Sequence, residues 1–149
     1  MRGFRFTTGF AVAVALGWLL GASSAVAEEG RIPVEVLVAH LSSEGSGVDP
    51  SAERLDRKLR GQFKYSSLKV LQKRRLDLAI DEVGTLDLPN GKAARVRPIS
   101  KTDTGVLIAV DVEGAAKMDV RAKSGHLIVI RAGAYEGGNL VLSLEPDYE

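Results

Sequence analysis

Most of the chain beyond residue 30 alternates apolar and polar positions with a period of two, which is the pattern of β-strands. In residues 33–41, Val34, Val36 and Val38 fall on one face, because successive side chains of a strand point to opposite sides. The other face of this segment is almost as apolar. Residues 33–41 are therefore predicted to form a central strand that is covered on both faces.

After a short loop rich in serine and glycine, the apolar spacing becomes helical. Asp49 is placed to accept a backbone N–H as an N-cap, and Pro50 suits the first position of a helix. Leu55 and Leu59 then recur on one side of the segment. The pattern predicts one amphipathic helix over residues 50–62.

Strand periodicity returns at Tyr65 and continues almost to the C-terminus. The first part, up to Asp81, fits two strands or one long bent strand. Residues 85–88 and 94–97 then flank Pro89-Asn90-Gly91-Lys92. An Asn-Gly pair between two alternating segments is a strong signal for a β-hairpin, so we predict a hairpin at this point.

These elements predict a mainly β protein, an antiparallel β-sandwich of about seven to eight strands with one amphipathic helix after the first strand. An alternative is a local βαβ unit, in which residues 33–41 and the strand around Leu68 run parallel to each other and the helix joins them. The later segments form hairpins in either case.

The N-terminus has the organisation of a secretory signal peptide. Arg2 and Arg5 precede an apolar stretch over residues 10–20, and Ala25-Val26-Ala27 fits the small-residue cleavage site. We therefore predict removal of residues 1–27, leaving 28–149 as a single domain in the periplasm or outside the cell. An uncleaved anchor helix is the alternative, but the apolar stretch is shorter than the roughly 20 residues that a span needs. No later segment is apolar enough to span a membrane.

Composition limits the chemistry of the mature chain. Removing Arg2 and Arg5 from the 20 basic residues leaves 18 against 19 acidic ones, a net charge of −1. The absence of cysteine excludes disulfides, thiolate catalysis and cysteine-based zinc sites. No nucleotide-binding or nucleophile motif is present either, so we expect neither a cofactor nor an enzymatic activity.

Basic residues are concentrated between Arg54 and Arg75, where the only acid is Asp56. Such a segment favours an acidic protein partner or an anionic glycan or lipid of the envelope; a merely solvated face is the alternative. Nucleic acid is not expected, given the export signal and the few aromatic residues. The candidate partner-binding residues are Arg54, Arg57, Lys58, Arg60, Lys64, Lys73, Arg74 and Arg75, with Lys69 in the same run.

The remaining candidates are weaker. Tyr135 lies in a glycine-rich connection, where its ring could contact a partner or close the edge of the core. His40 and His126 lack the spacing of metal ligands, so we expect no metal site. Asp111 and Glu113 share a strand face, which is the geometry of an acid–base pair and also the ordinary pattern of a polar strand face.

Several features follow one another along the chain: a signal peptide, a first strand, the Asp49-Pro50 helix, the link Phe63-Lys64-Tyr65, the hairpin sequence Leu86-Asp87-Leu88-Pro89-Asn90-Gly91 and a series of short strands. In this order the chain resembles small exported proteins of Gram-negative bacteria with no assigned activity. Some of these occur in the periplasmic parts of envelope-spanning machines such as gliding-motility complexes. The resemblance implies a non-catalytic periplasmic scaffold subunit that binds other envelope proteins.

Overall fold

A computed structural model describes residues 30–149, so the predicted signal peptide and its cleavage site after Ala27 lie outside the described residues. The described part is mainly β, with one short helix after the first strand, which confirms the predicted fold class. The elements are β1 (Arg31–Ser42), β2 (Gly47–Val48), η1 (Pro50–Ala52), α1 (Glu53–Leu59), β3 (Ser67–Ala79), β4 (Gly84–Asp87), β5 (Ala93–Thr102), β6 (Gly105–Val112), β7 (Ala116–Ala122), β8 (Ile128–Tyr135) and β9 (Gly138–Pro146).

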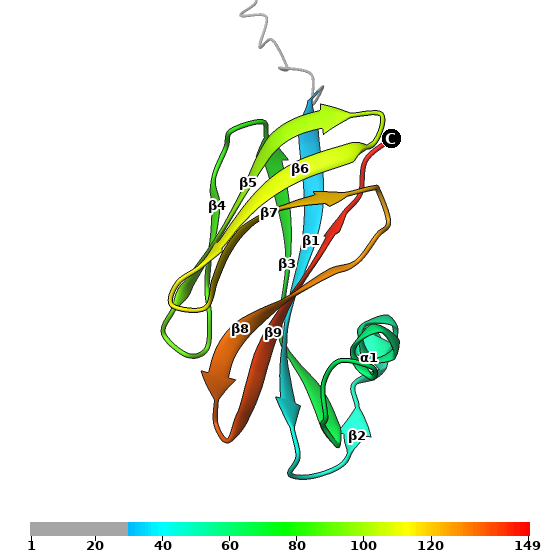
Figure 1. The fold of residues 1–149 in the computed structure, drawn as a ribbon, viewed down its shortest axis with the longest axis vertical. Helices are drawn as coiled ribbons and strands as arrows, with labels where there is room; N and C mark the ends of the chain where they lie inside the picture. The colour runs from blue at the N-terminus through cyan, green and yellow to red at the C-terminus, as the bar shows by residue number, and fades with distance from the viewer. Residues whose placement is uncertain (1–29) are drawn as a thin grey trace, which may run out of the picture.

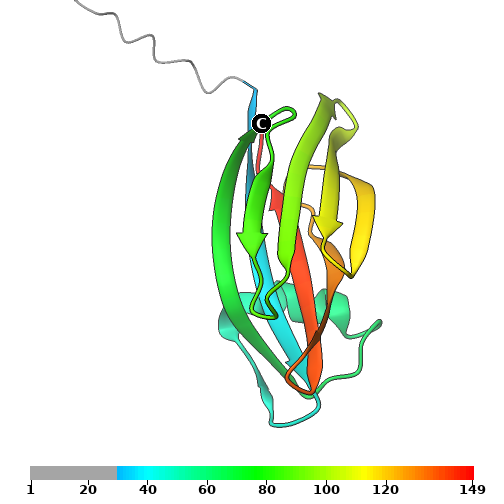
Figure 2. The same cartoon turned by 90° about the vertical axis from the view of Figure 1, so that its left-hand side faces the viewer.

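The strands form two packed sheets. Sheet A has the order β2-β3-β1-β9-β8, and sheet B has the order β4-β5-β6-β7. Sheet B lies over the upper half of sheet A in Figure 1, and in Figure 2 the strands of the two sheets are seen broadside, with one sheet overlapping the other. β1 and β3 are neighbours but antiparallel, so the βαβ alternative is wrong; the parallel neighbour of β3 is the very short β2.

β1 is a central strand, as predicted, because β3 and β9 flank it. Its residues Val34, Val36 and Val38 face sheet B and belong to the main core between the sheets. Leu37 and Ala39 face the opposite way, into a smaller apolar cluster that includes Leu55 and Leu59 of α1. Sheet A is therefore buried on its inner face by sheet B and, over part of its outer face, by the helix.

The helical segment is shorter than residues 50–62. Asp49 caps it as expected, accepting a hydrogen bond from the backbone N–H of Ser51 at 3.0 Å. A 3₁₀ turn comes first, and α1 then ends at Leu59. The chain leaves the helix after Arg60 because Gly61 is a poor helix former and because Phe63 and Tyr65 pack back onto the smaller cluster.

One hairpin was predicted from its turn residues, and it forms at that place. β4 and β5 are antiparallel around the Asn90-Gly91 turn, which confirms that hairpin. β3 is one long strand with an irregularity opposite Val38 and Ala39, so the long bent strand is the correct form of the two. At the end of the β8–β9 hairpin the chain needs glycine, because a Cβ on Gly138 would lie 2.1 Å from the carbonyl oxygen of Leu41.

Candidate functional site

The basic segment 54–75 is divided between α1 and β3, and much of its charge is used within the molecule. Four of its residues form ion pairs, with N–O distances from 2.8 to 3.2 Å. The pairs are Arg54–Glu145, Arg60–Asp56, Lys73–Glu35 and Arg75–Asp147. Lys58 additionally donates a hydrogen bond to the carbonyl of Leu127. These contacts hold α1 and β3 to the strands around them.

The side chains of the other basic residues of the segment, Arg57, Lys64, Lys69 and Arg74, form no ion pair or hydrogen bond within residues 30–149. Lys69 and Arg74 lie on the inner side of sheet A, because their cross-strand partners His40 and Val36 face that way. Arg57 lies on α1 and Lys64 follows α1, both on the outer side. The structure therefore does not bring the segment together as one continuous basic surface.

Asp56 is the acid of this segment, and sequence reasoning gave it no role. It is buried, with a relative exposure of 6%. The Tyr65 hydroxyl donates to its Oδ1 at 2.6 Å, and the Arg60 Nε donates to its Oδ2 at 2.8 Å. The three side chains, here called the Asp56 cluster, tie α1 to the start of β3. A lone acid among nine bases was the signal that could have identified it.

The Asp56 cluster shifts the titration of its members. Burial raises the pKa of Asp56, but the hydrogen bonds from Tyr65 and Arg60 and the charge of Arg60 outweigh it, so the pKa lies below its ordinary value. Burial, together with the hydrogen bond to Asp56, raises the pKa of Tyr65 to about 12. The carboxylate is therefore engaged in stabilising the fold at neutral pH.

Tyr135 ends β8, and its ring is half-buried against the main core. The ring meets His40 edge-on, with centroids 5.4 Å apart, and His40 Nε2 lies 2.9 Å from the Tyr135 carbonyl oxygen. This is the core-closing position considered above, and it leaves part of the ring at the surface.

The candidate acid–base residues and the second histidine each contact a different group in the fold. Asp111 faces Arg95 at 3.9 Å, while Glu113 accepts a hydrogen bond from the backbone N–H of Ala93. His126 Nδ1 lies 3.3 Å from the carbonyl oxygen of Ser124. Within the described part of the chain, no three histidine or acidic side chains gather as ligands for a metal ion.

A groove that sequence reasoning missed runs between the end of β7 and the start of β8. It is a wide, open hollow of about 700 Å³, here called the β7–β8 groove. Val120 of β7 and Leu127, Ile128 and Val129 at the start of β8 line it, and all of them are half-buried. β7 and β8 are edge strands, because each has a hydrogen-bonded neighbour on one side only.

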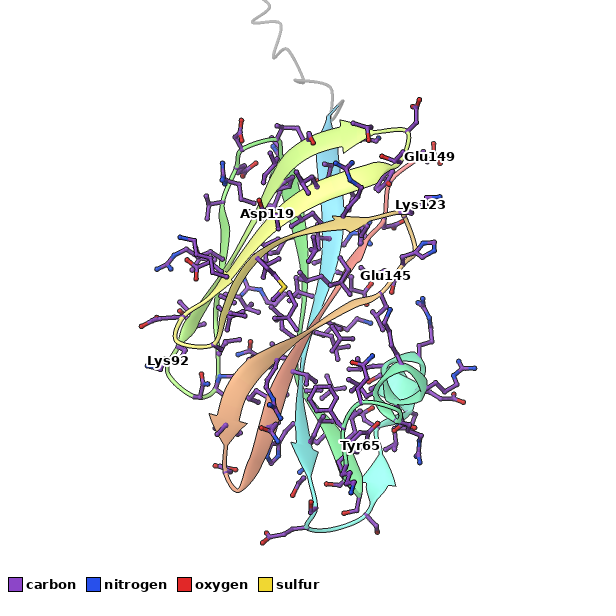
Figure 3. The ribbon with its side chains drawn as sticks, viewed as in Figure 1. Tyr65, Lys92, Asp119, Lys123, Glu145 and Glu149 are labelled. Atoms are coloured by element: carbon purple, nitrogen blue, oxygen red, sulfur yellow. The ribbon has the colours of Figure 1, made fainter. Side chains whose placement is uncertain are left out.

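The rim of the β7–β8 groove carries positive charge. Lys58 of α1, Arg121 of β7 and Lys123 line it together with His126, and no lining residue is acidic. Lys123 is labelled in Figure 3, on the connection between β7 and β8. Of the residues predicted to bind a partner, Lys58 alone lies in this groove. The alternating pattern of the sequence does not predict this groove, because the groove lies between the edge strands of two different sheets.

The single α-helix among residues 30–149, α1, is too short and too polar to cross a membrane. Comparison of the chain with protein-family models, with curated proteins and with solved structures finds no match.

Proposed function

We propose that this protein is a non-catalytic interaction subunit of a protein assembly in the cell envelope, and that it binds its partner at the β7–β8 groove. The observation that carries the proposal is the composition of that groove. Half-buried apolar side chains lie between two strand edges that have no neighbour, beside a rim of basic residues. Exposed apolar surface rimmed by polar groups is typical of protein-binding sites, and strand edges accept further strands.

The envelope is the proposed location because residues 1–27 have the pattern of a signal peptide. The resemblance to exported subunits of envelope-spanning machines supports the same location. Partners would therefore be other envelope proteins.

A second candidate function is the binding of an anionic envelope glycan or lipid through segment 54–75. It is favoured by the basic side chains there that form no ion pair or hydrogen bond within the described residues. Two of them, Arg57 and Lys64, lie on the same side of sheet A. The division of the others between two faces of that sheet makes it the second choice. Such binding would weaken as salt is added, because it depends on exposed charges.

The test is chemical crosslinking in intact cells, followed by affinity purification of the tagged protein and identification of what co-purifies. We expect the same envelope proteins to be recovered with the wild type and with Lys92→Glu, a charge reversal far from the groove. Lys123→Glu, the same reversal at the groove, is expected to lose them. Recovery of no protein above background, or equal recovery with both variants, would contradict the proposal.

A further inference from the structure

Part of the free edge of β8 is open for another strand. β8 is hydrogen-bonded to β9 alone. Its C-terminal half is irregular between Arg131 and Gly133, and the side chain of Asn90 donates to the Ala132 carbonyl at 3.3 Å. Residues 128–131 remain regular and carry one charged side chain, that of Arg131. Most exposed edges are protected by charges, bulges or a covering element, and this stretch has little such protection.

The two faces of residues 128–131 offer different surroundings to an added strand. Ile128 and Ile130 pair with Leu144 and Leu142 of the main core, so they face inward. Val120 of β7 also faces inward. On the inner side, an added strand would therefore meet apolar groups.

On the outer side, the same strand would meet positive charge beside the apolar side chain of Val129. Arg131 is cross-strand to Val141 of the outer, smaller cluster, and α1 with Lys58 covers that side of sheet A. Side chains alternate along a strand, so a matching strand would alternate apolar and acidic residues. The nearby acid Glu145 does not supply this charge, since Arg54 already binds both of its carboxylate oxygens.

A second copy of the chain that pairs symmetrically through β8 does not satisfy this surface. Pairing two β8 edges would bring two basic rims together, and like charges that face each other across strands repel. An acidic segment from a different protein avoids that repulsion.

Resting on the proposed function, we infer that the β7–β8 groove binds an extended segment of a partner protein in which apolar and acidic side chains alternate. The segment adds to residues 128–131 as a further strand of sheet A. Its backbone pairs with the free edge of β8, and its apolar side chains cover Val120 and Ile128. Its carboxylates face Lys58 and Arg131 on the outer side, with Lys123 at the rim of the groove.

The probe is a fluorescent octapeptide that alternates valine and glutamate, titrated into the exported protein and followed by anisotropy. We expect saturable binding that weakens with salt, and no binding of the peptide in which lysine replaces glutamate. A third peptide, N-methylated on alternate residues, lacks the donors of one edge and is expected to fail as well. Lys123→Glu should weaken binding by about fivefold to tenfold, while Lys92→Glu should leave it unchanged.

Hydrogen exchange locates the peptide. Amides within residues 128–131 should become protected when the glutamate peptide binds, and those of β4, an edge strand of sheet B, should not. Equal binding of the lysine peptide, or protection at another edge, would overturn the inference.

The two proposals fail differently. Crosslinked partners that depend on Lys123, together with no binding of the glutamate peptide, would retain the interaction subunit and reject the acidic strand. Peptide binding without any crosslinked partner in cells would reject the interaction subunit and retain the acidic strand.

Discussion

The smaller cluster beneath α1 and the β7–β8 groove are two apolar surfaces that the packing of the sheets alone leaves uncovered. Over the first, the chain folds its own helix, and Leu55 and Leu59 are almost completely buried there. The remaining pocket between helix and sheet measures only about 90 Å³. Over the second, nothing in residues 30–149 is placed, and a hollow of about 700 Å³ stays open.

The difference separates surface that stabilises the fold from surface that residues 30–149 leave open. The Arg54–Glu145 ion pair and the hydrogen bond from Lys58 to the Leu127 carbonyl hold the helix in place over the smaller cluster. At the groove, the side chain of Lys123 forms no contact of this kind within the described residues. Basic residues thus occupy two different environments in this molecule, which their clustering in the sequence does not distinguish.

The largest expected effect is on the covered surface. Leu59→Ala should lower the free energy of unfolding by about 2–4 kcal/mol, because it opens a cavity beneath a helix that cannot collapse onto the sheet. Urea denaturation followed by circular dichroism measures it. A loss below about 0.5 kcal/mol would show that the helix does not seal this surface, and the comparison would fail.

A smaller loss is expected from the Asp56 cluster. Tyr65→Phe removes the hydrogen bond to the buried carboxylate and should cost about 1.5–3 kcal/mol, the range for hydrogen bonds to charged groups. The same denaturation experiment tests it. Tyr148→Phe is the control, since its hydroxyl makes only a long hydrogen bond of 3.4 Å to Ala122.

The Asp56 cluster should also make stability depend on pH at both extremes. The pKa of Asp56 is lowered in the folded protein, so its contribution is present above the ordinary carboxyl range and is lost as pH falls through the folded value. The pKa of Tyr65 is raised to about 12, so its contribution is complete below about pH 10 and is lost as pH rises towards 12.

Variants of the same two residues check this pH dependence. Asp56→Asn should flatten the acid side of the urea midpoint plotted against pH, and Tyr65→Phe the alkaline side. Unchanged profiles would contradict the assigned couplings.

At the open surface, the matching truncation should cost less. Val120→Ala removes a half-buried side chain, and we expect a loss below about 1 kcal/mol because much of the removed surface already contacts water. A loss as large as that of Leu59→Ala, measured in parallel, would show that the groove is part of the core and not an open site.

The smallest effect on stability is expected from charge reversal at the rim. Lys123→Glu should change the free energy of unfolding by less than about 0.5 kcal/mol, as is usual for surface substitutions. Lys92→Glu serves as its matched control. Any loss of partner binding by Lys123→Glu is then a property of the groove rather than of the fold.

Periodicity was sufficient to predict the sandwich, the central position of β1 and the Asn90-Gly91 hairpin, because each leaves a pattern in residues that are close in sequence. The direction of β1 relative to β3 was not certain from sequence, since a helix between two strands is compatible with either direction. The helix end at Leu59 depends on tertiary packing of Phe63 and Tyr65, which local propensity does not report.

The candidate site was harder to predict for the same reason. The sequence placed nine basic residues in one run, but their ion-pair partners, such as Glu145 and Asp147, lie some 70 or more positions away. The β7–β8 groove joins residues of α1, β7 and β8, and its openness depends on where two sheets end. No pattern within one segment carries that information.

The most direct test of the central claim, that the β7–β8 groove is a partner-binding site, is site-specific photocrosslinking in living cells. A photoreactive amino acid replaces Lys123 in one strain and Lys92 in another. We predict a discrete crosslinked product with a partner protein from position 123 and none from position 92. No product at position 123, or the same products from both positions, would contradict the claim.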